Sequence, residues 1–300
     1  MKPKTKFFLD VMDAVDASDS TKKNAIELLN ILLYFDPYKL TKFEFSFKVK
    51  NGKIGDDVRF LNMDANAYSC VNGVFFRKRV ALFEKIMKKR GFNDFDKVTK
   101  AIRNLSINPM DLYFGFDVHD NDILFAFWLI FGGVKRTGDV SFWPYNFNSI
   151  LRNFFNTSKS KMPNILNKEI LNFGVDLGKS GLYYKFYYLC REKILTNHDF
   201  TELMKSINKS LKDFKYFYFF SEMYDEGGKL VKKKLFIEFL EDIMNDDKKM
   251  VNIIVRSLSR INNINFNHSQ IKNVLHKCGG RISLISFQLD GTLTFYIRPD

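Results

Sequence analysis

Basic and aromatic side chains alternate along several short stretches of the sequence, and these residues are the first candidates for chemistry. Lys185 and Tyr187 lie between Tyr184, Phe186 and Tyr188, so a lysine interrupts an aromatic run where a solvated lysine is not expected. In a strand, this alternation places one set of side chains on each face. Positive charge held in this way could bind a phosphate-bearing ligand, a nucleic acid or an anionic membrane.

The overall charge supports an anionic partner only in part. The chain has 47 Lys and Arg against 34 Asp and Glu, which gives a formal net charge of +13. Its 33 Phe, together with frequent Lys, Asn and Ile, indicate an AT-rich coding sequence. We therefore assign about half of the excess lysine to compositional drift and to solvated helix faces.

Several common catalytic and metal-binding classes lack their motifs here. Cys70, Cys190 and Cys278 are far apart and form no C-x-x-C pair, so neither a disulfide framework nor a zinc site is indicated. The sequence has no P-loop, no G-x-G-x-x-G after a predicted strand, no H-E-x-x-H and no G-x-S-x-G. No apolar stretch approaches the ~20 residues that span a bilayer. We expect a soluble, cytoplasmic protein.

Five pairs of short strands, each joined by a turn, are predicted to position the candidate residues. Turns such as Asn51-Gly52 and Asp290-Gly291 tolerate positive φ and favour hairpins. Amphipathic helices are predicted between the hairpins. The predicted hairpins are Phe43–Val49 with Asp57–Leu61, Leu112–Val118 with Ile123–Phe131, Phe173–Leu177 with Leu182–Leu189, Tyr216–Met223 with Lys229–Phe236, and Ile282–Leu289 with Thr292–Arg298.

The two faces of these strands differ in polarity. The strand Phe43–Val49 alternates Phe or Val with Glu44, Ser46 and Lys48, so one face is predicted to meet helices and the other a polar space. Strands of parallel sheets are buried on both faces and read as continuous apolar runs instead. We expect the phenylalanines of this strand and the run Tyr216–Phe220 to form the core between strands and helices.

A closed barrel satisfies both faces. Ten antiparallel strands with helices outside and a wet lumen would bury the apolar face and leave no exposed strand edge. No Pro/Gly/Ser-rich linker divides the chain. The sequence therefore predicts one α+β domain over residues 1–300, built from about five αββα repeats.

This repetition resembles the ABBA aromatic prenyltransferases, a family with a prenyltransferase barrel. Tyr184-Lys185-Phe186-Tyr187 resembles the Lys-x-Tyr strand of the fungal indole branch, in which both side chains face the diphosphate. Asp225–Lys232 is similar to the turn and return strand of the fourth bacterial hairpin, whose arginine binds the diphosphate. Phe127–Gly133 resembles a Trp-Leu-x-Phe-Gly-Gly strand end of the bacterial branch. Glu44 lies where the indole branch has a glutamate that holds the aromatic nitrogen.

The resemblance implies transfer of an isoprenyl group from an allylic diphosphate to an aromatic small molecule or peptide inside the lumen. Basic residues would neutralise the diphosphate, and aromatic faces would shield the allylic cation. Glu44 would orient or deprotonate the acceptor as a general base, unless it is a rim carboxylate paired with Lys48 or Arg59. Mg²⁺ is a possible cofactor. The predicted substrate-binding residues are Trp128, Lys185, Tyr187, Lys232, Lys234, Tyr296 and Arg298.

The sequence also departs from the family pattern. Ala126 lies where the bacterial branch has a lysine just before the Trp, and the last hairpin has Thr294 and Arg298 where a lysine or glutamate is common. A second hypothesis is therefore a nucleic-acid-binding protein, indicated by the net charge and by the basic and aromatic residues of Lys212–Tyr218. A third is a non-catalytic barrel that binds a lipid-like or aromatic ligand.

Overall fold

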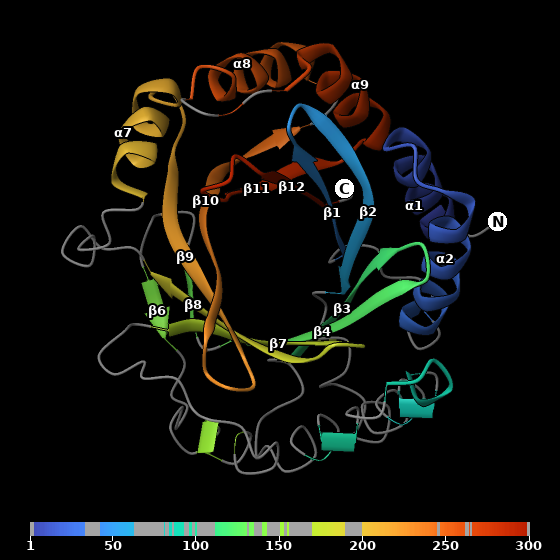
Figure 1. The fold of residues 1–300 in the computed structure, drawn as a ribbon. Helices are drawn as coiled ribbons and strands as arrows, with labels where there is room; N and C mark the ends of the chain where they lie inside the picture. The colour runs from blue at the N-terminus through green and yellow to red at the C-terminus, as the bar shows by residue number, and fades with distance from the viewer. Residues whose placement is uncertain are drawn as a thin grey trace.

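Antiparallel strands close into a barrel around a central lumen (Figure 1). The computed structural model describes residues 3–33, 43–62, 112–130, 132–134, 140–142, 170–189, 200–244, 247–261, 264 and 266–298, with shorter pieces between 81 and 100 and at 151, 152 and 155. The barrel strands are β1 (Phe43–Lys50), β2 (Lys53–Asn62), β3 (Leu112–His119), β4 (Asp122–Ile130), β7 (Ile170–Gly178), β8 (Gly181–Leu189), β9 (Tyr216–Asp225), β10 (Leu230–Met244), β11 (Arg281–Phe287) and β12 (Leu293–Arg298).

The strands follow one another around the barrel as consecutive hairpins. Their order is β1-β12-β11-β10-β9-β8-β7-β4-β3-β2, so the first and last strands close the ring. Ser46 of β1 lies opposite Tyr296 of β12 in this closing pair. A separate two-stranded sheet pairs β5 (Gly132–Val134) with β6 (Val140–Phe142). The predicted closed ten-stranded antiparallel barrel is confirmed.

All five predicted hairpins are present, and local turn chemistry explains them. Between β1 and β2, Asn51 and Gly52 both have positive φ, 50° and 79°, as a two-residue hairpin turn of type I′ requires. Several strands are longer than predicted: β2 begins at Lys53, β7 begins at Ile170 and β10 continues to Met244. The five hairpin turns lie at one end of the barrel, which we call the hairpin end.

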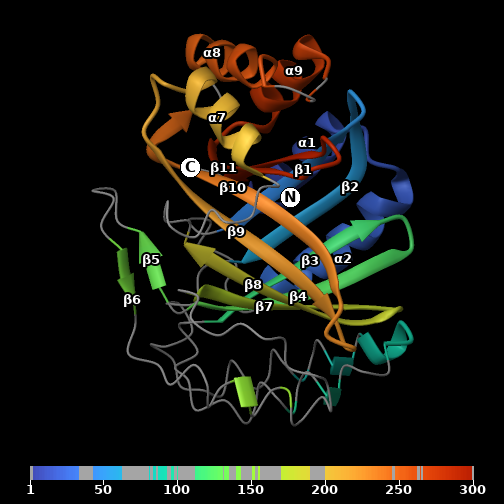
Figure 2. The same cartoon turned by 60° about the vertical axis from the view of Figure 1, so that its left-hand side comes forward.

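Helices cover the outside of the barrel (Figures 1 and 2). They are α1 (Pro3–Ala14), α2 (Asp19–Leu33), α7 (Thr201–Ser210), α8 (Lys248–Leu258) and α9 (His268–Cys278). Asp247 caps α8 by accepting a hydrogen bond from the backbone N–H of Met250, and Asn267 caps α9 by accepting one from Gln270. None of the helices that the structure describes is long and apolar enough to cross a membrane.

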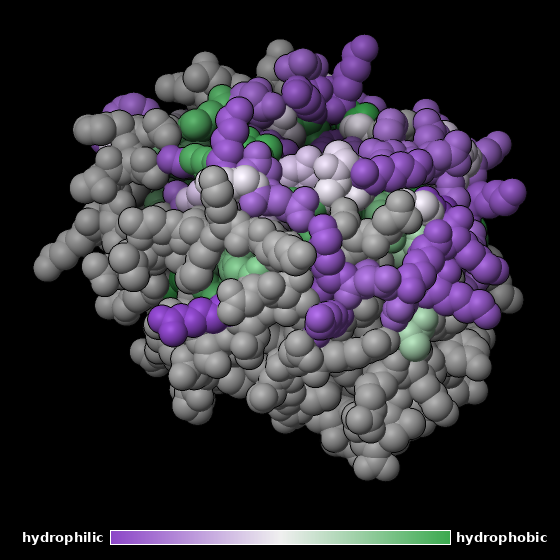
Figure 3. Space-filling model, turned by 60° about the horizontal axis from the view of Figure 1, so that its bottom comes forward, coloured by the Kyte–Doolittle hydropathy of each residue, from purple (hydrophilic) through white to green (hydrophobic). Residues whose placement is uncertain are grey.

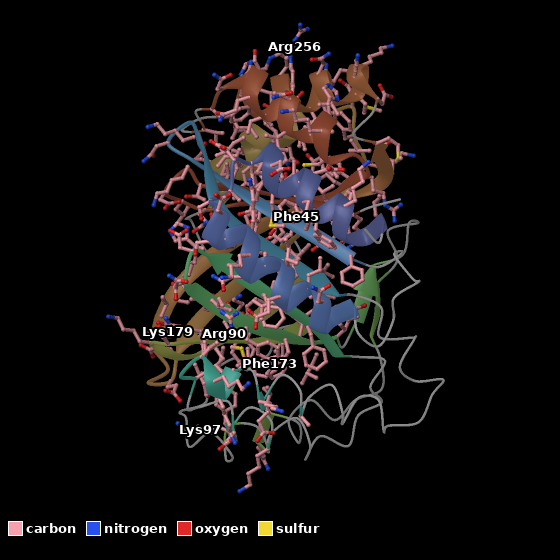
Figure 4. The ribbon with its side chains drawn as sticks, turned by 90° about the vertical axis from the view of Figure 1, so that its right-hand side faces the viewer. Phe45, Arg90, Lys97, Phe173, Lys179 and Arg256 are labelled. Carbon is pink, nitrogen blue, oxygen red and sulfur yellow. The ribbon has the colours of Figure 1, made fainter. Side chains whose placement is uncertain are left out.

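The main hydrophobic core lies between the barrel and these helices. Phe8 of α1 packs against Phe43 and Phe45 of β1, with ring centroids 5.8 and 6.5 Å apart. Figure 4 shows Phe45 beneath the N-terminal helices. The prediction that these phenylalanines form the outer core is confirmed. For Phe217 and Phe219 it is wrong, because alternation along β9 turns these two rings towards a second cluster inside the lumen.

The described residues on one face of the outer surface are mostly polar. Figure 3 shows one face of the molecule, on which hydrophilic side chains predominate among the described residues. Among the described residues, most large apolar side chains are buried in the outer core or in the lumen, and the exposed exceptions are Leu230, Val231, Ile253 and Leu289.

Candidate active site in the barrel lumen

Alternation along each strand sends basic side chains into the half of the lumen nearest the hairpin end. Lys48 of β1, Arg59 of β2 and Lys185 of β8 all point inward, as do Lys232 and Lys234 of β10. Arg59, Lys185, Lys232 and Lys234 share the lining of one internal cavity. We call these four residues the cation cluster.

Two carboxylates on neighbouring strands partly neutralise the cation cluster. Arg59 forms an ion pair with Asp117 of β3 and lies 3.9 Å from Asp176 of β7, measured from Nη2 to Oδ2. Asp176 also pairs with Lys185. Burial alone would lower the pKa of Arg59, but the charges of Asp117 and Asp176 outweigh burial and raise it. In Asp117 the attraction of Arg59 and Lys48 likewise outweighs burial and lowers the pKa of the carboxyl.

The surroundings of the three lysines in the cluster disfavour their charged form. Burial, together with the charge of Arg59, lowers the pKa of Lys185 to about 8 despite the attraction of Asp176. Burial and the neighbouring cations lower the pKa of Lys232, and they lower that of Lys234 much further. Within the part of the chain that the structure describes, neither Lys232 nor Lys234 has a carboxylate partner. The cluster therefore has an unmet attraction for negative charge.

The two members of the Arg59–Asp117 ion pair line two different cavities, Arg59 the inner one and Asp117 the outer one. The inner one, about 20 Å³, is lined by the cation cluster and by Tyr187, Phe236 and Tyr296. The outer one, about 390 Å³, lies at the hairpin end and is lined by Lys48, Asp57, Asp117 and nearby residues of β3 and β4. The inner volume holds about one water molecule. A larger anion would require the flexible lysine side chains to move apart.

Aromatic rings form a belt next to the cations. Trp128 of β4 donates a hydrogen bond from Nε1 to the hydroxyl of Tyr187, at 3.1 Å. The guanidinium of Arg59 and the ammonium of Lys185 lie 5.9 and 5.7 Å from the centroid of the Trp128 ring. These distances are within the range of cation–π attraction. The belt is completed by Phe219, Phe236 and Tyr296, which belong to the same lumenal cluster.

The indole of Trp128 lies against bare backbone on both sides. A Cβ atom added to Gly174 of β7 would come within 2.7 Å of Cδ1 of Trp128. A Cβ atom on Gly115 of β3 would come within 3.3 Å of its Cζ3 and within 2.6 Å of the carbonyl oxygen of Phe60. Both glycines thus leave the space that the flat ring occupies.

The opposite half of the lumen has a different composition. Glu44 of β1 is buried, and its Oε2 accepts hydrogen bonds from Ser283 Oγ at 2.9 Å and from Arg298 Nε at 3.1 Å. Glu238 of β10 faces the same region, because it lies opposite the lumenal Leu284 in the strand register. Burial, reinforced by the charge of Glu44, raises the pKa of Glu238 to about 7 although Arg298 opposes the shift.

The structure brings most of the predicted site residues together. Lys185, Tyr187, Lys232, Lys234 and Tyr296 line the inner cavity. Trp128 joins them through Tyr187. Arg298 lies apart from these residues, in the opposite half of the lumen, where it forms an ion pair with Glu44.

The structure also determines two features that the sequence left open, the partners of Glu44 and the consequence of alanine at position 126. Glu44 was expected to pair with Lys48 or Arg59 if it were a rim carboxylate, but these two bind Asp57 and Asp117. Ala126 lies opposite Asp176, so the lumen has no lysine at that position and the cations come from β2, β8 and β10.

Sequence reasoning missed Arg59, Asp117 and Asp176 as members of the site. The alternation of Arg59 with Val58 and Phe60 on β2 could have indicated that Arg59 faces the lumen. Its role in the site, however, depends on carboxylates of two other strands. No group of three or more His, Cys, Asp or Glu among the described residues is arranged to hold a metal ion.

Solved structures share this fold, although sequence comparison finds no relative. The sequence matches no known family profile and no curated protein. The chain is similar in structure to 6-dimethylallyltryptophan synthase from Micromonospora olivasterospora in complex with DMASPP and Trp. The TM-score is 0.66 at 12% identity, over 98% of this chain and 95% of that one.

Two further solved structures show the same likeness. Prenyltransferase PriB, in a ternary complex with L-tryptophan and dimethylallyl thiolodiphosphate, matches with a TM-score of 0.64 at 11% identity, over 98% of this chain and 94% of that one. NotF in complex with brevianamide F and DMSPP matches with a TM-score of 0.54 at 11% identity, over 97% and 92% of the two chains. The chain therefore has the prenyltransferase-barrel fold.

Proposed function

We propose that this protein is an aromatic prenyltransferase that moves an isoprenyl group from an allylic diphosphate to an aromatic acceptor in the lumen. The observation that carries the proposal is the convergence of Arg59, Lys185, Lys232 and Lys234 on one internal cavity beside an aromatic belt. Excess positive charge suits a diphosphate, and the adjoining aromatic faces suit a carbocation. The complexes of structural neighbours with thiolodiphosphates and tryptophan or brevianamide F support this choice.

In the proposed reaction, the C–O bond between the isoprenyl group and the diphosphate breaks, and the cation cluster holds the leaving group. The allylic cation is shielded by Trp128, with Tyr187 and Tyr296 as hydroxyl partners of the diphosphate. The acceptor's aromatic carbon or heteroatom bonds to the cation and then loses a proton. The donor would enter through the outer cavity, past the Arg59–Asp117 ion pair.

We assign the acceptor to the opposite half of the lumen, where Glu44 orients it and receives its proton. Only Oε2 of Glu44 is engaged by the described residues, through Ser283 and Arg298. In this proposal Arg298 is a positioning residue that fixes the orientation of the Glu44 carboxylate, rather than a ligand of the diphosphate. We further propose that residues 1–300 act as one domain in the cytoplasm, a compartment consistent with the free, buried Cys278.

The first test is isothermal titration of dimethylallyl and geranyl thiolodiphosphate, which do not ionise, with and without Mg²⁺. We expect saturable one-to-one binding that Lys185→Ala weakens at least tenfold. Lys179→Ala is the matched control, because Lys179 is exposed at a hairpin turn and points away from the barrel (Figure 4). A comparison of the two titration series shows whether Mg²⁺ is needed to hold the diphosphate.

Each alternative gives a different result. Weak binding that disappears with salt and is unaffected by Lys185→Ala would contradict the proposed diphosphate site. It would favour a nucleic-acid-binding function. Tight binding without product, after screening of aromatic amino acids and peptides with dimethylallyl diphosphate, would favour a non-catalytic ligand-binding barrel.

A further inference from the structure

The outer surface formed by α8 and α9 is strongly basic. From residue 248 to residue 278 the sequence contains no Asp or Glu. Over the same stretch it has six basic residues, which are Lys248, Lys249, Arg256, Arg260, Lys272 and Lys277. The chain as a whole has 34 acidic residues for 47 basic ones, so an acid-free stretch of two helices is a local feature rather than a reflection of composition.

Lys249 and Arg256 lie on the exposed side of α8, and Arg260 follows two residues after the end of the helix. Lys249, Ile253, Arg256 and Arg260 follow at intervals of four, three and four residues, and all are exposed. The opposite side of α8 is buried in the outer core. Figure 4 shows Arg256 pointing away from the barrel. We call the exposed side of α8 and α9 the basic face.

Some cations elsewhere on the outer surface have carboxylate partners. Lys22 pairs with Asp13 at 2.8 Å, and Arg90 pairs with Glu27 at 2.6 Å. Among the described residues, none of the six cations between residues 248 and 278 has such a partner. Like charges that are close together and unpaired repel one another, so binding of an anionic surface would lower their free energy.

The character of the basic face favours a lipid surface over a nucleic acid. Ile253 lies among the cations and is 38% exposed. Exposed Phe, Tyr or Trp, on which bases stack, is absent from the described residues of this stretch. Lys and Arg near an anionic leaflet are each attracted to it, and an aliphatic side chain between them can enter the headgroup region. We propose that the basic face docks on an anionic bilayer surface, and this proposal is independent of the proposed enzymatic function.

The test is co-sedimentation of the full chain with vesicles of phosphatidylcholine alone or with about one third phosphatidylglycerol. The test variant is Lys249→Glu with Arg256→Glu and Arg260→Glu. The control, which we call the α7 variant, reverses the same number of exposed charges on α7 and just after it, with Lys205→Glu, Lys209→Glu and Lys212→Glu. We expect binding only to the anionic vesicles, at least tenfold weaker in the α8 variant, within threefold of wild type in the α7 variant, and weakened by salt.

Two arms separate lipid from nucleic acid and from misfolding. Ile253→Ser should weaken vesicle binding without changing the affinity for duplex DNA, and thermal unfolding should show that the variants fold like wild type. The proposal is overturned if anionic vesicles do not bind at low salt, or if the α7 and α8 variants lose binding equally. Tight DNA or RNA binding that needs the α8 cations, with no vesicle binding, would overturn it in favour of a nucleic-acid surface.

Discussion

The two halves of the lumen treat charge in opposite ways. Near the hairpin end, Lys232 and Lys234 lack a carboxylate partner among the described residues, and the charges of Arg59 and Lys185 are shared with Asp117 and Asp176. In the opposite half, Arg298 is the cation that contacts Glu44, and Glu238 adds a second carboxyl group. One half attracts an anion, whereas the other is neutral to acidic.

This difference indicates how the two substrates would be told apart. A diphosphate gains from the lysines of the cation cluster and would be repelled by Glu44, and also by Glu238 where that group is ionised, above about pH 7. An acceptor with an N–H or O–H donor gains from Glu44 and has nothing to neutralise near the lysines. The aromatic belt lies between the two halves, where the reacting carbons of both substrates would meet.

The largest expected effect is on stability, at the best-paired cation. Arg59→Ala would leave Asp117 and Asp176 without their shared partner, and removal of one member of a buried ion pair costs about 3–5 kcal/mol. We expect urea unfolding to show a fall of that size in the free energy of unfolding. A fall of less than ~1 kcal/mol, the median value of an exposed pair, would mean that the network is solvated.

The next effect concerns the opposite half and depends on pH. The folded protein holds the proton of Glu238 up to about pH 7, whereas the unfolded chain releases it near the ordinary value of 4.5. The folded state therefore binds more protons in this interval, and stability from this group is lost as pH rises from about 4.5 to 7. Glu238→Gln should raise the free energy of unfolding at pH 8 by about 3 kcal/mol and have little effect at pH 4. Urea unfolding at both pH values checks this, and an equal effect at both would contradict it.

Lys234→Met tests whether a lumenal cation without a carboxylate partner differs from the paired Arg59 in its effect on stability. It removes a buried charge that has no carboxylate partner among the described residues, so we expect unchanged or higher stability near neutral pH. The same change should weaken dimethylallyl thiolodiphosphate at least tenfold, because the cluster loses a cation that faces the cavity. If Lys234→Met instead lowered stability and left binding of the analogue unchanged, Lys234 would have a structural role and not a role in diphosphate binding.

The smallest effect is a linkage between protons and the donor. The pKa of Lys185 is about 8 in the unliganded protein, and a bound diphosphate would raise it. Binding above pH 8 should therefore take up protons, and affinity should fall a few-fold between pH 7 and pH 9. Titration at pH 8.5 in two buffers of different ionisation enthalpy measures the uptake. Equal apparent enthalpies in both buffers would argue that Lys185 is already fully charged.

Local patterns predicted much of the fold and part of the site. Turn residues such as Asn51-Gly52 specified the hairpins, and alternation around Lys185 specified which side chains face inward. Each of these signals is contained within a few neighbouring residues of the sequence. The rest depends on partners distant in the chain. Arg298 could not be placed beside Glu44 without knowing that β12 pairs with β1, and the inward turn of Phe219 depends on the register of β9 in the closed ring.

The position of Trp128 between Gly115 and Gly174 makes that one side chain a removable part of the lumen wall. Its ring covers backbone on both neighbouring strands, so truncation would leave a flat slot between the two glycines. Such a slot has the outline of an indole, and added indole should re-form the wall in Trp128→Gly. The width of the lumen could therefore be reset by a single residue, without a change in the strands.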